Sequence, residues 1–267
     1  REDRKALKNG SVHVVVGTPG RIKDLIEKKA LRTDFLRIVV LDEADEMLGR
    51  GFVDEIREIF ENLPADIQVC LFSATMPPEI VEMTEKFMKD PVKILVKNQQ
   101  LTLEGIKQFY ISLQEDSQKF GTLLQLYKNM VISQCIVFTN RKERVKELSD
   151  RLAEHKFVVS CISGDMEMSE RVNVMREFRS GSSRILISTD LLGRGIDIQQ
   201  VNLIINYDLP TETAKYIHRI GRSGRFGRKG VAINFVTAGD AQFLANLRQF
   251  YNTQIEELPM DLSKIYD

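Results

Sequence analysis

Carboxylates crowd the end of one apolar run in this sequence. Asp42, Glu43 and Asp45 come directly after Ile38–Leu41, a run with the composition of a buried strand. Two carboxylates about 4 Å apart repel by roughly 1–4 kcal/mol at effective dielectrics of about 80 to 20, and a bound cation relieves that repulsion. Oxygen ligands at a strand's carboxyl end suit Mg²⁺ and nucleotide phosphates, and a neighbouring glutamate can orient a water for attack on a phosphoryl group. The alternative is an acidic helix start, which the helix dipole favours.

Two hydroxyl side chains follow the next strand-like run. Ser73 and Thr75 lie in the segment FSATMPPE, ahead of a helix that prolines open. Because the carboxyl ends of parallel strands meet at one edge of a sheet, these hydroxyls could bond the carboxylate of Asp45. The alternative is that they only cap the helix that follows.

Arginines recur at every third position near the end of the chain. The segment HRIGRSGRFGR contains Arg219, Arg222, Arg225 and Arg228, interleaved with Gly221, Gly224 and Gly227. Guanidinium groups present planar forks to phosphate oxygens and can stabilise a transferring γ-phosphoryl group. Glycines permit a close approach of the backbone, so the segment predicts phosphate contact, with a solvated basic loop as the alternative.

A fourth segment, STDLLGRGID, places Asp197 after a strand and a Gly-Arg-Gly turn. An acidic residue in this setting can accept hydrogen bonds from ribose hydroxyls. A purely structural turn is the alternative.

Strand-like and helical segments alternate along the whole chain. Most strand-like runs are continuous in Val, Ile and Leu, which is typical of sheets covered on both faces. Amphipathic faces such as Val145, Leu148 and Leu152 fit helices between them. The pattern predicts an α/β protein with parallel sheets built from βαβ units. The expected strands are Val12–Val16, Ile38–Leu41, Val69–Phe72, Lys107–Leu113, Cys135–Phe138, Val158–Ile162, Ile185–Ser188, Val201–Ile205 and Val231–Val236.

A polar segment without periodicity divides these units. We expect a linker over 98–106, a first domain over 1–97 and a second domain over 107–267. Enough strand–helix units follow the linker for a complete doubly wound domain, whereas too few precede it. We therefore expect the first domain to be truncated at its N-terminal side.

Composition restricts the partners and the compartment. The formal net charge is zero, so nucleic-acid contacts must come from local basic patches. Three cysteines without a CxxC pair argue against a disulfide framework or a structural zinc site and favour a reducing compartment. No apolar run reaches the ~18 residues that span a bilayer, so no membrane association is expected.

Taken in order, the motifs resemble the DEAD-box family of ATP-dependent RNA helicases, and most closely its eukaryotic initiation factor 4A branch. The matching segments are TPGR (Thr18–Arg21), DEAD (Asp42–Asp45), SAT (Ser73–Thr75), IVFTN (Ile136–Asn140), STDLLGRGID (Ser188–Asp197) and HRIGRSGRFGR (His218–Arg228). The resemblance implies two RecA-like domains that close over ATP and RNA. Closure would bring acidic groups of one domain and arginines of the other around one triphosphate, which gates phosphoryl transfer by RNA.

The resemblance also implies roles for individual residues. Asp42 would hold Mg²⁺ through water, Glu43 would position the attacking water, and Asp45 would couple to Ser73, Thr75 and His218. Arg222 and Arg225 would act as arginine fingers, with Gly195 and Asp197 near the ribose. Six residues would contact the sugar-phosphate backbone of RNA, which gives binding without sequence specificity. They are Thr18, Gly20, Arg21, Gly164, Arg171 and Thr189.

The sequence departs from the family pattern in three ways. Met168 stands where a glutamine is usual, and Arg141 follows Asn140 where the nearest relatives have threonine. Neither a GxxxxGK[ST] loop nor the adenine-reading glutamine motif occurs in the sequence. We therefore expect this stretch alone to show no meaningful ATPase activity, whereas the parent protein hydrolyses ATP.

Alternative functions remain open at this point. The expected activity is RNA-stimulated ATP hydrolysis that unwinds local duplexes or clamps single-stranded RNA in translation initiation, with protein regulators of domain closure. A non-catalytic scaffold or an exon-junction-type clamp with the same fold is the alternative, although Glu43, Arg222 and Arg225 disfavour a scaffold. A DNA-directed motor is not expected. The cytoplasm is the expected compartment, or the nucleus for an exon-junction or ribosome-assembly relative.

Overall fold

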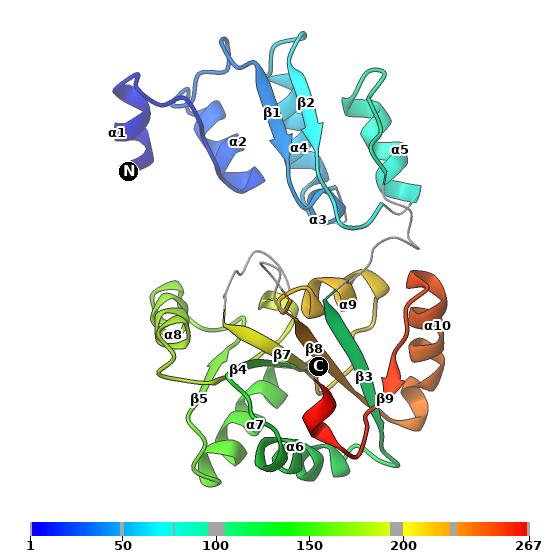
Figure 1. The fold of residues 1–267 in the computed structure, drawn as a ribbon. Coiled ribbons are helices and arrows are strands. Elements are labelled where there is room, and N and C mark those ends of the chain that lie inside the picture. Colours follow the sequence, from blue (N-terminus) through cyan, green and yellow to red (C-terminus); the bar gives the residue numbers. More distant parts are fainter. Residues whose placement is uncertain are drawn as a thin grey trace. The chain divides into compact units, whose positions relative to one another are not determined.

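A computed structural model describes residues 2–48, 51–76, 78–95, 105–192, 200–224 and 229–265. The chain divides into two compact units, Arg1–Ile94 (unit 1) and Leu95–Asp267 (unit 2) (Figure 1). The segment expected as a linker, 98–106, falls mostly outside the described residues. In the described part of the chain, no helix is both long enough and apolar enough to cross a membrane.

The described residues of unit 1 form a two-stranded parallel sheet and five helices. Strand β1 (Ile38–Leu41) pairs with β2 (Gln68–Leu71), with Ile38 opposite Gln68 and Leu41 opposite Leu71. The helices are α1 (Glu2–Lys8), α2 (Pro19–Glu27), α3 (Ala44–Met47), α4 (Val53–Glu61) and α5 (Pro78–Phe87). Proline fits the first position of α2 and of α5 because that position makes no intrahelical N–H bond.

The core of unit 1 lies between α3, α4 and α5. Ala44, Leu48, Ile56 and Ile80 are buried there, with Phe60 and Phe87 in ring contact at 4.7 Å between centroids. Ile56 and Phe60 lie one helical turn apart, as the apolar period of this segment predicts. The core therefore supports the short connection from β1 into α3, which contains the acidic residues.

The predicted strand over Val12–Val16 is wrong. These residues are not in a strand, and Val14 and Val16 are 78% and 91% exposed. β-Branched residues favour a strand only where a neighbouring strand pairs with them. Among the described residues, none pairs with 12–16 in a ladder.

In the part of unit 2 that the structure describes, seven strands form one sheet in which every pairing is parallel. The strand order is β5-β6-β4-β7-β8-β3-β9. The strands are β3 (Ile106–Ser112), β4 (Gln134–Phe138), β5 (Val159–Ile162), β6 (Ile185–Ser188), β7 (Val201–Asn206), β8 (Gly230–Val236) and β9 (Glu256–Glu257). The six longer strands match the sequence expectation to within two residues at each end, whereas β9 was not predicted.

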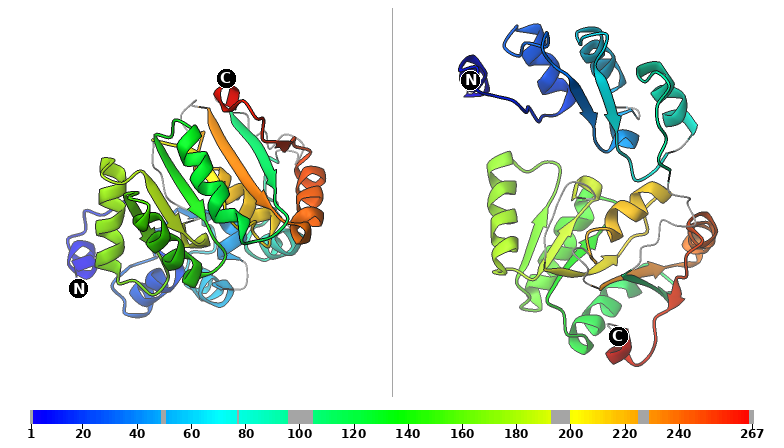
Figure 2. Two further views of the ribbon diagram at one scale, coloured as in Figure 1. Left: turned by 90° about the horizontal axis from the view of Figure 1, so that it is seen from below. Right: turned by 45° about the horizontal axis from the view of Figure 1, so that its top comes forward.

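Helices cover both faces of this sheet. They are α6 (Gln118–Asn129), α7 (Lys142–Glu154), α8 (Met168–Ser180), α9 (Thr213–Ile220) and α10 (Ala241–Tyr251). The ribbon shows these helices on either side of the sheet (Figure 2). Buried residues of α6 and α7 pack in one core, and those of α8, α9 and α10 pack in another. Cys135 and Val137 of β4 enter the first core, and Ile136 and Phe138 enter the second. Alternate residues of one continuous apolar strand are thus buried on opposite faces.

Parallel pairing gathers the loops of unit 2. The segments after β5, β6, β4 and β7 leave the same edge of the sheet from neighbouring strands. This edge is where open α/β sheets bind ligands. It brings together Gly164, Thr189, Asn140 and Asp208, which are distant in the sequence.

Candidate functional site

The acidic segment of unit 1 begins with a backbone turn. Glu43 has φ 53° and ψ 48°, in the left-handed region, which costs roughly 1–2 kcal/mol for a non-glycine residue. Its N–H donates to Asp42 Oδ1 at 2.9 Å, and the next N–H, of Ala44, donates to the carbonyl of Phe72 at 3.0 Å. Ala44 is fully buried, whereas Asp42 is exposed. The turn therefore presents Asp42 at the tip of β1 while its backbone is anchored to the tip of β2.

The predicted hydrogen bond to the Asp45 carboxylate is present for Thr75, whereas Ser73 contacts the Asp45 backbone instead. The Thr75 hydroxyl donates to Asp45 Oδ2, and the Asp45 N–H donates to Ser73 Oγ at 3.2 Å. Ser73 Oγ in turn donates to the carbonyl of Thr75 at 2.7 Å. Both hydroxyls therefore hydrogen-bond to Asp45: Thr75 bonds the carboxylate and Ser73 bonds the backbone N–H.

The acidic side chains after β1 offer carboxylate oxygens as donors. Asp42 and Glu43 contribute carboxylates that a hard cation such as Mg²⁺ prefers. These residues fit the ion, and Asp42, as the exposed carboxylate, is the one that would hold it.

The segment TPGR forms the start of α2. The carbonyl of Thr18 accepts the N–H groups of Arg21 and Ile22 at 3.0 Å each, and the space around Gly20 is open. The Arg21 guanidinium donates to Asp3 Oδ2 at 2.7 and 3.0 Å and to Asp24 Oδ2 at 3.1 Å. The hydrogen bond from Arg21 lowers the pKa of the Asp3 carboxyl group. The arginine expected at RNA thus has two carboxylate partners.

Two of the predicted RNA residues of unit 2 are in contact. Arg171 Nη2, on α8, donates to the carbonyl of Gly164 at 2.6 Å. Thr189 follows β6, and the carbonyl of the preceding Ser188 accepts the N–H of Thr139 at 2.9 Å. Gly164 and Thr189 therefore lie at the ends of the adjacent strands β5 and β6, with Arg171 beside the first.

The arginine-rich segment begins on α9. His218 and Arg222 are both buried, and Arg222 Nε donates to the carbonyl of His218 at 3.0 Å. Gly224 has φ 70°, and a Cβ there would lie 2.7 Å from a side-chain carbon of Ile106. The sequence predicted a close approach of the backbone at the glycines. At Gly224, the backbone closely approaches Ile106 at the start of β3. Gly195, Asp197 and Arg225 lie outside the described residues.

Sequence reasoning missed the role of Arg219. This side chain is fully buried and donates to Asn140 Oδ1 at 2.8 Å and to Asp190 Oδ1 at 2.5 Å. The helical period contained the signal, because Arg219 lies three residues after Tyr216 and beside Ile220, both fully buried.

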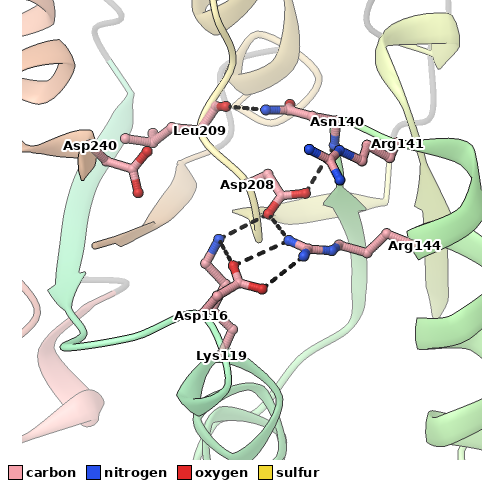
Figure 3. Close-up of a pocket in the computed structure, with 8 residues that line it drawn as sticks. All are labelled: Asp116, Lys119, Asn140, Arg141, Arg144, Asp208, Leu209 and Asp240. Atoms are coloured by element: carbon pink, nitrogen blue, oxygen red, sulfur yellow. Dashed lines mark hydrogen bonds and ion pairs between the residues drawn. The ribbon is translucent and has the colours of Figure 1, made fainter. Parts of the chain in front are cut away.

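A polar pocket of about 250 Å³ lies at the carboxyl edge of unit 2 (Figure 3). Within it, Asp208 Oδ1 accepts from Lys119 Nζ at 2.9 Å and from Arg144 Nη1 at 2.6 Å. Asp116 contacts the same two cations, at 2.8 Å from Lys119 Nζ and 2.7 Å from Arg144 Nη2. Asn140 donates its backbone N–H to Asp208 Oδ2 at 3.0 Å. Four charged residues that line the pocket thus form one ion-pair cluster, which is joined to the tip of β4 through Asn140.

The two cations of this cluster lower the pKa of its exposed member, Asp116. Burial acts to raise the pKa of Asp116, but hydrogen bonds and the charges of Lys119 and Arg144 outweigh it and leave the pKa below its usual value. No sequence motif marked this cluster, because Lys119 and Asp208 are 89 positions apart.

Both units are parallel α/β folds of the RecA-like class, with acidic residues at a strand tip of unit 1 and arginines at the end of a helix in unit 2. A model of DEAD/DEAH box helicases matches residues 1–84, and a model of the helicase conserved C-terminal domain matches residues 118–227. The chain belongs to the DEAD-box helicase family.

Its relatives include eukaryotic initiation factors. The chain is 58% identical over 265 residues to the ATP-dependent RNA helicase eIF4A of Aspergillus clavatus and 55% identical to eukaryotic initiation factor 4A of Drosophila melanogaster. In both cases the match covers 99% of this chain and 66% of the relative, so the chain spans slightly less than two thirds of their length.

Solved structures show the same fold. Dbp5 of S. cerevisiae bound to RNA and ADP BeF3 matches with a TM-score of 0.88 and 37% identity, over 94% of this chain and 66% of that chain. A DEAD box protein from the hyperthermophile Methanococcus jannaschii matches with a TM-score of 0.56 and 38% identity, over 93% of this chain and 67% of that chain.

Proposed function

We propose that the protein to which this chain belongs is an ATP-dependent RNA helicase of translation initiation. RNA binding stimulates ATP hydrolysis, which opens local duplexes or clamps RNA. The observation that supports this most is the connection of Asp45 to Ser73 and Thr75, because it fixes the acidic turn beside Glu43. Identity of 55–58% to initiation factors supports the assignment to translation.

The residues divide the chemistry between the two units. On unit 1, Asp42 would hold Mg²⁺, and Glu43 would orient the water that attacks the γ-phosphoryl group. When bound, Mg²⁺ neutralises negative charge on the phosphate oxygens. On unit 2, Arg222 and Arg225 stabilise the charge that develops in transfer, and Gly195 and Asp197 bind near the ribose. Hydrolysis needs both sets, which is why RNA-driven closure can control it.

RNA binds through its backbone and without sequence specificity. Thr18, Gly20 and Arg21 provide contacts on unit 1; Gly164, Arg171 and Thr189 provide them on unit 2. Solved Dbp5 complexes contain RNA, and others contain Gle1 and Nup159. By analogy, we propose that protein regulators of closure also act on this helicase.

ATP hydrolysis by the full-length protein tests this function. Single-stranded RNA stimulates turnover in the wild type, and Glu43→Gln lowers the stimulated rate by roughly 10²–10⁴-fold, the usual contribution of a positioned base. Glu46→Gln, which changes an exposed carboxylate on α3 three residues after Glu43, is the matched control and keeps full turnover. Unchanged turnover in Glu43→Gln would remove this residue from its role, and equal stimulation by DNA would contradict an RNA-directed motor.

A further inference from the structure

Arg219 is one of the largest fully buried side chains among the described residues. Its Nε donates to Asp190 Oδ1 at 2.5 Å, and its Nη2 donates to Asn140 Oδ1 at 2.8 Å. Its Nη1 donates to the carbonyl of Asp208 at 2.7 Å and to Asn206 Oδ1 at 3.4 Å. All three guanidinium nitrogens thus have partners, and none of these partners is on its own helix.

The partners of Arg219 come from three adjacent strands. Asp190 follows β6, Asn140 follows β4, and Asn206 ends β7, in the order in which these strands lie in the sheet. A buried guanidinium without partners would be strongly destabilising, so α9 is held against these strand tips in one arrangement. The ring of Phe138, at the end of β4, lies 5.2 Å from the guanidinium carbon.

A second buried contact fixes the same helix. Tyr216, one turn before Arg219, donates its hydroxyl to Gln108 Oε1 at 2.8 Å. Asn234 Nδ2 donates to the Tyr216 hydroxyl at 3.2 Å, and Asn206 Nδ2 donates to Asn234 Oδ1 at 2.8 Å. Burial holds the pKa of Tyr216 well above its usual value, so the phenol remains a donor. Helix α9 is therefore tied to the sheet at two points, and these points are joined through Asn206 and Asn234.

We propose that Arg219 is a positioning residue that couples the RNA side of unit 2 to its nucleotide side. This rests on the proposed function, in which Thr189, next to Asp190, contacts RNA and Arg222, three residues after Arg219, contacts the triphosphate. The guanidinium touches neither ligand in this assignment. Because one side chain holds both segments, a shift of the β6 tip on RNA binding is transmitted to the end of α9.

A conservative substitution in the full-length protein tests the coupling. Arg219→Lys keeps the positive charge but loses the fork that reaches three strands at once. We expect RNA-stimulated kcat to fall roughly tenfold to hundredfold, the size expected when charge-assisted hydrogen bonds are lost. The KM for ATP is expected to stay within a factor of about two, since no nucleotide contact is removed, and the basal rate without RNA is expected to fall less than the stimulated rate.

Arg248→Lys is the matched control. Arg248 donates from Nε and Nη2 to the carbonyl of Ile255 at 3.1 and 2.5 Å, so the substitution also removes a fork, but this acceptor precedes β9 and does not follow β4 or β6. We expect it to reduce thermal stability while the ratio of RNA-stimulated to basal turnover stays unchanged. A merely structural Arg219 would behave in the same way, and that outcome would overturn the proposal.

Asp190→Asn provides a second test should Arg219→Lys fail to fold. The asparagine has the shape of Asp190 and one acceptor oxygen but no charge. We therefore expect a smaller loss of RNA stimulation than in Arg219→Lys. Where Arg219→Lys folds, adding Asp190→Asn to it gives no further loss if both act through one contact. Additive losses would overturn the proposal. Absence of RNA stimulation in the wild type would instead contradict the proposed function.

Discussion

The Thr75 hydroxyl donates a hydrogen bond to the carboxylate of Asp45, thirty positions earlier in the chain. This contact ties the loop after β2 to the acidic turn after β1. Together with the bond from the Asp45 N–H to Ser73 Oγ, it leaves both the carboxylate and the backbone of Asp45 with partners from the neighbouring strand tip. The geometry of the acidic turn therefore depends on a segment that is not acidic itself.

Removing this hydroxyl should loosen the acidic turn. In Thr75→Ala the net loss of one hydrogen bond is about 1 kcal/mol, which corresponds to roughly fivefold faster local opening. We expect the Asp45 amide to exchange its hydrogen faster by that factor, as measured by hydrogen–deuterium exchange. Thr75→Ser keeps the hydroxyl and serves as the control. Equal exchange in wild type and Thr75→Ala would show that the bond does not hold the turn.

Lys119, a buried member of the ion-pair cluster, should contribute to the stability of unit 2. The side chain of Lys119 is 5% exposed and that of Asp208 is 10% exposed. Lys119→Met leaves Asp208 with Arg144 as its one remaining cation in the cluster, and we expect unfolding to become easier by about 3 kcal/mol, the lower end of the range for a broken buried pair. Lys128→Met, on the exposed side of α6, is expected to change stability by less than about 0.5 kcal/mol. Thermal unfolding followed by circular dichroism compares the two, and equal melting temperatures would contradict a stabilising role for Lys119.

The exposed member of that cluster should give a pH-dependent contribution. The pKa of Asp116 is lowered in the folded protein, so its ionised form is favoured by folding. Its contribution is therefore fully present above the ordinary carboxyl pKa of about 4 and is lost as the pH falls through the lowered value. We expect wild type to be more stable than Asp116→Asn at pH 7 and the difference to shrink below about pH 4. Unfolding curves across this range provide the measurement; a difference that grows on acidification would reverse the assigned sign. Asp150→Asn, exposed on α7, is the control.

The three cysteines should differ in reactivity. Cys135 is fully buried in β4, and Tyr127 lies 2.7 Å from its sulfur. Burial raises the pKa of the Cys135 thiol to about 12, so almost no reactive thiolate forms at pH 8. Cys70 and Cys161 are only partly buried. We expect iodoacetamide to modify these two in the folded protein and Cys135 only after unfolding, as read by mass spectrometry of the peptides. Labelling of Cys135 at the rate of the other two would contradict its burial.

Local patterns were sufficient for most elements. Strands Ile38–Leu41 and Ile185–Ser188 have the predicted limits, and Val145, Leu148 and Leu152 form the buried face of α7 as expected. Continuous β-branched runs and a helical period are properties of neighbouring residues, so they are readable before folding. The same holds for the motifs that identify the family. In contrast, Glu256–Glu257 pairs with Phe109–Tyr110 at the edge of the sheet without any apolar signal of its own.

The α/β class, most of the strands along the chain and the residue types available for phosphoryl chemistry could be read from the sequence. Tertiary structure alone decided which of these residues meet. It left Val12–Val16 outside any strand, buried Arg219 among the tips of three strands, and placed Lys119 against Asp208. The physical reason is that the free energy of a strand pairing or of a buried charge depends on partners distant in the sequence, which exist only once the sheet has formed.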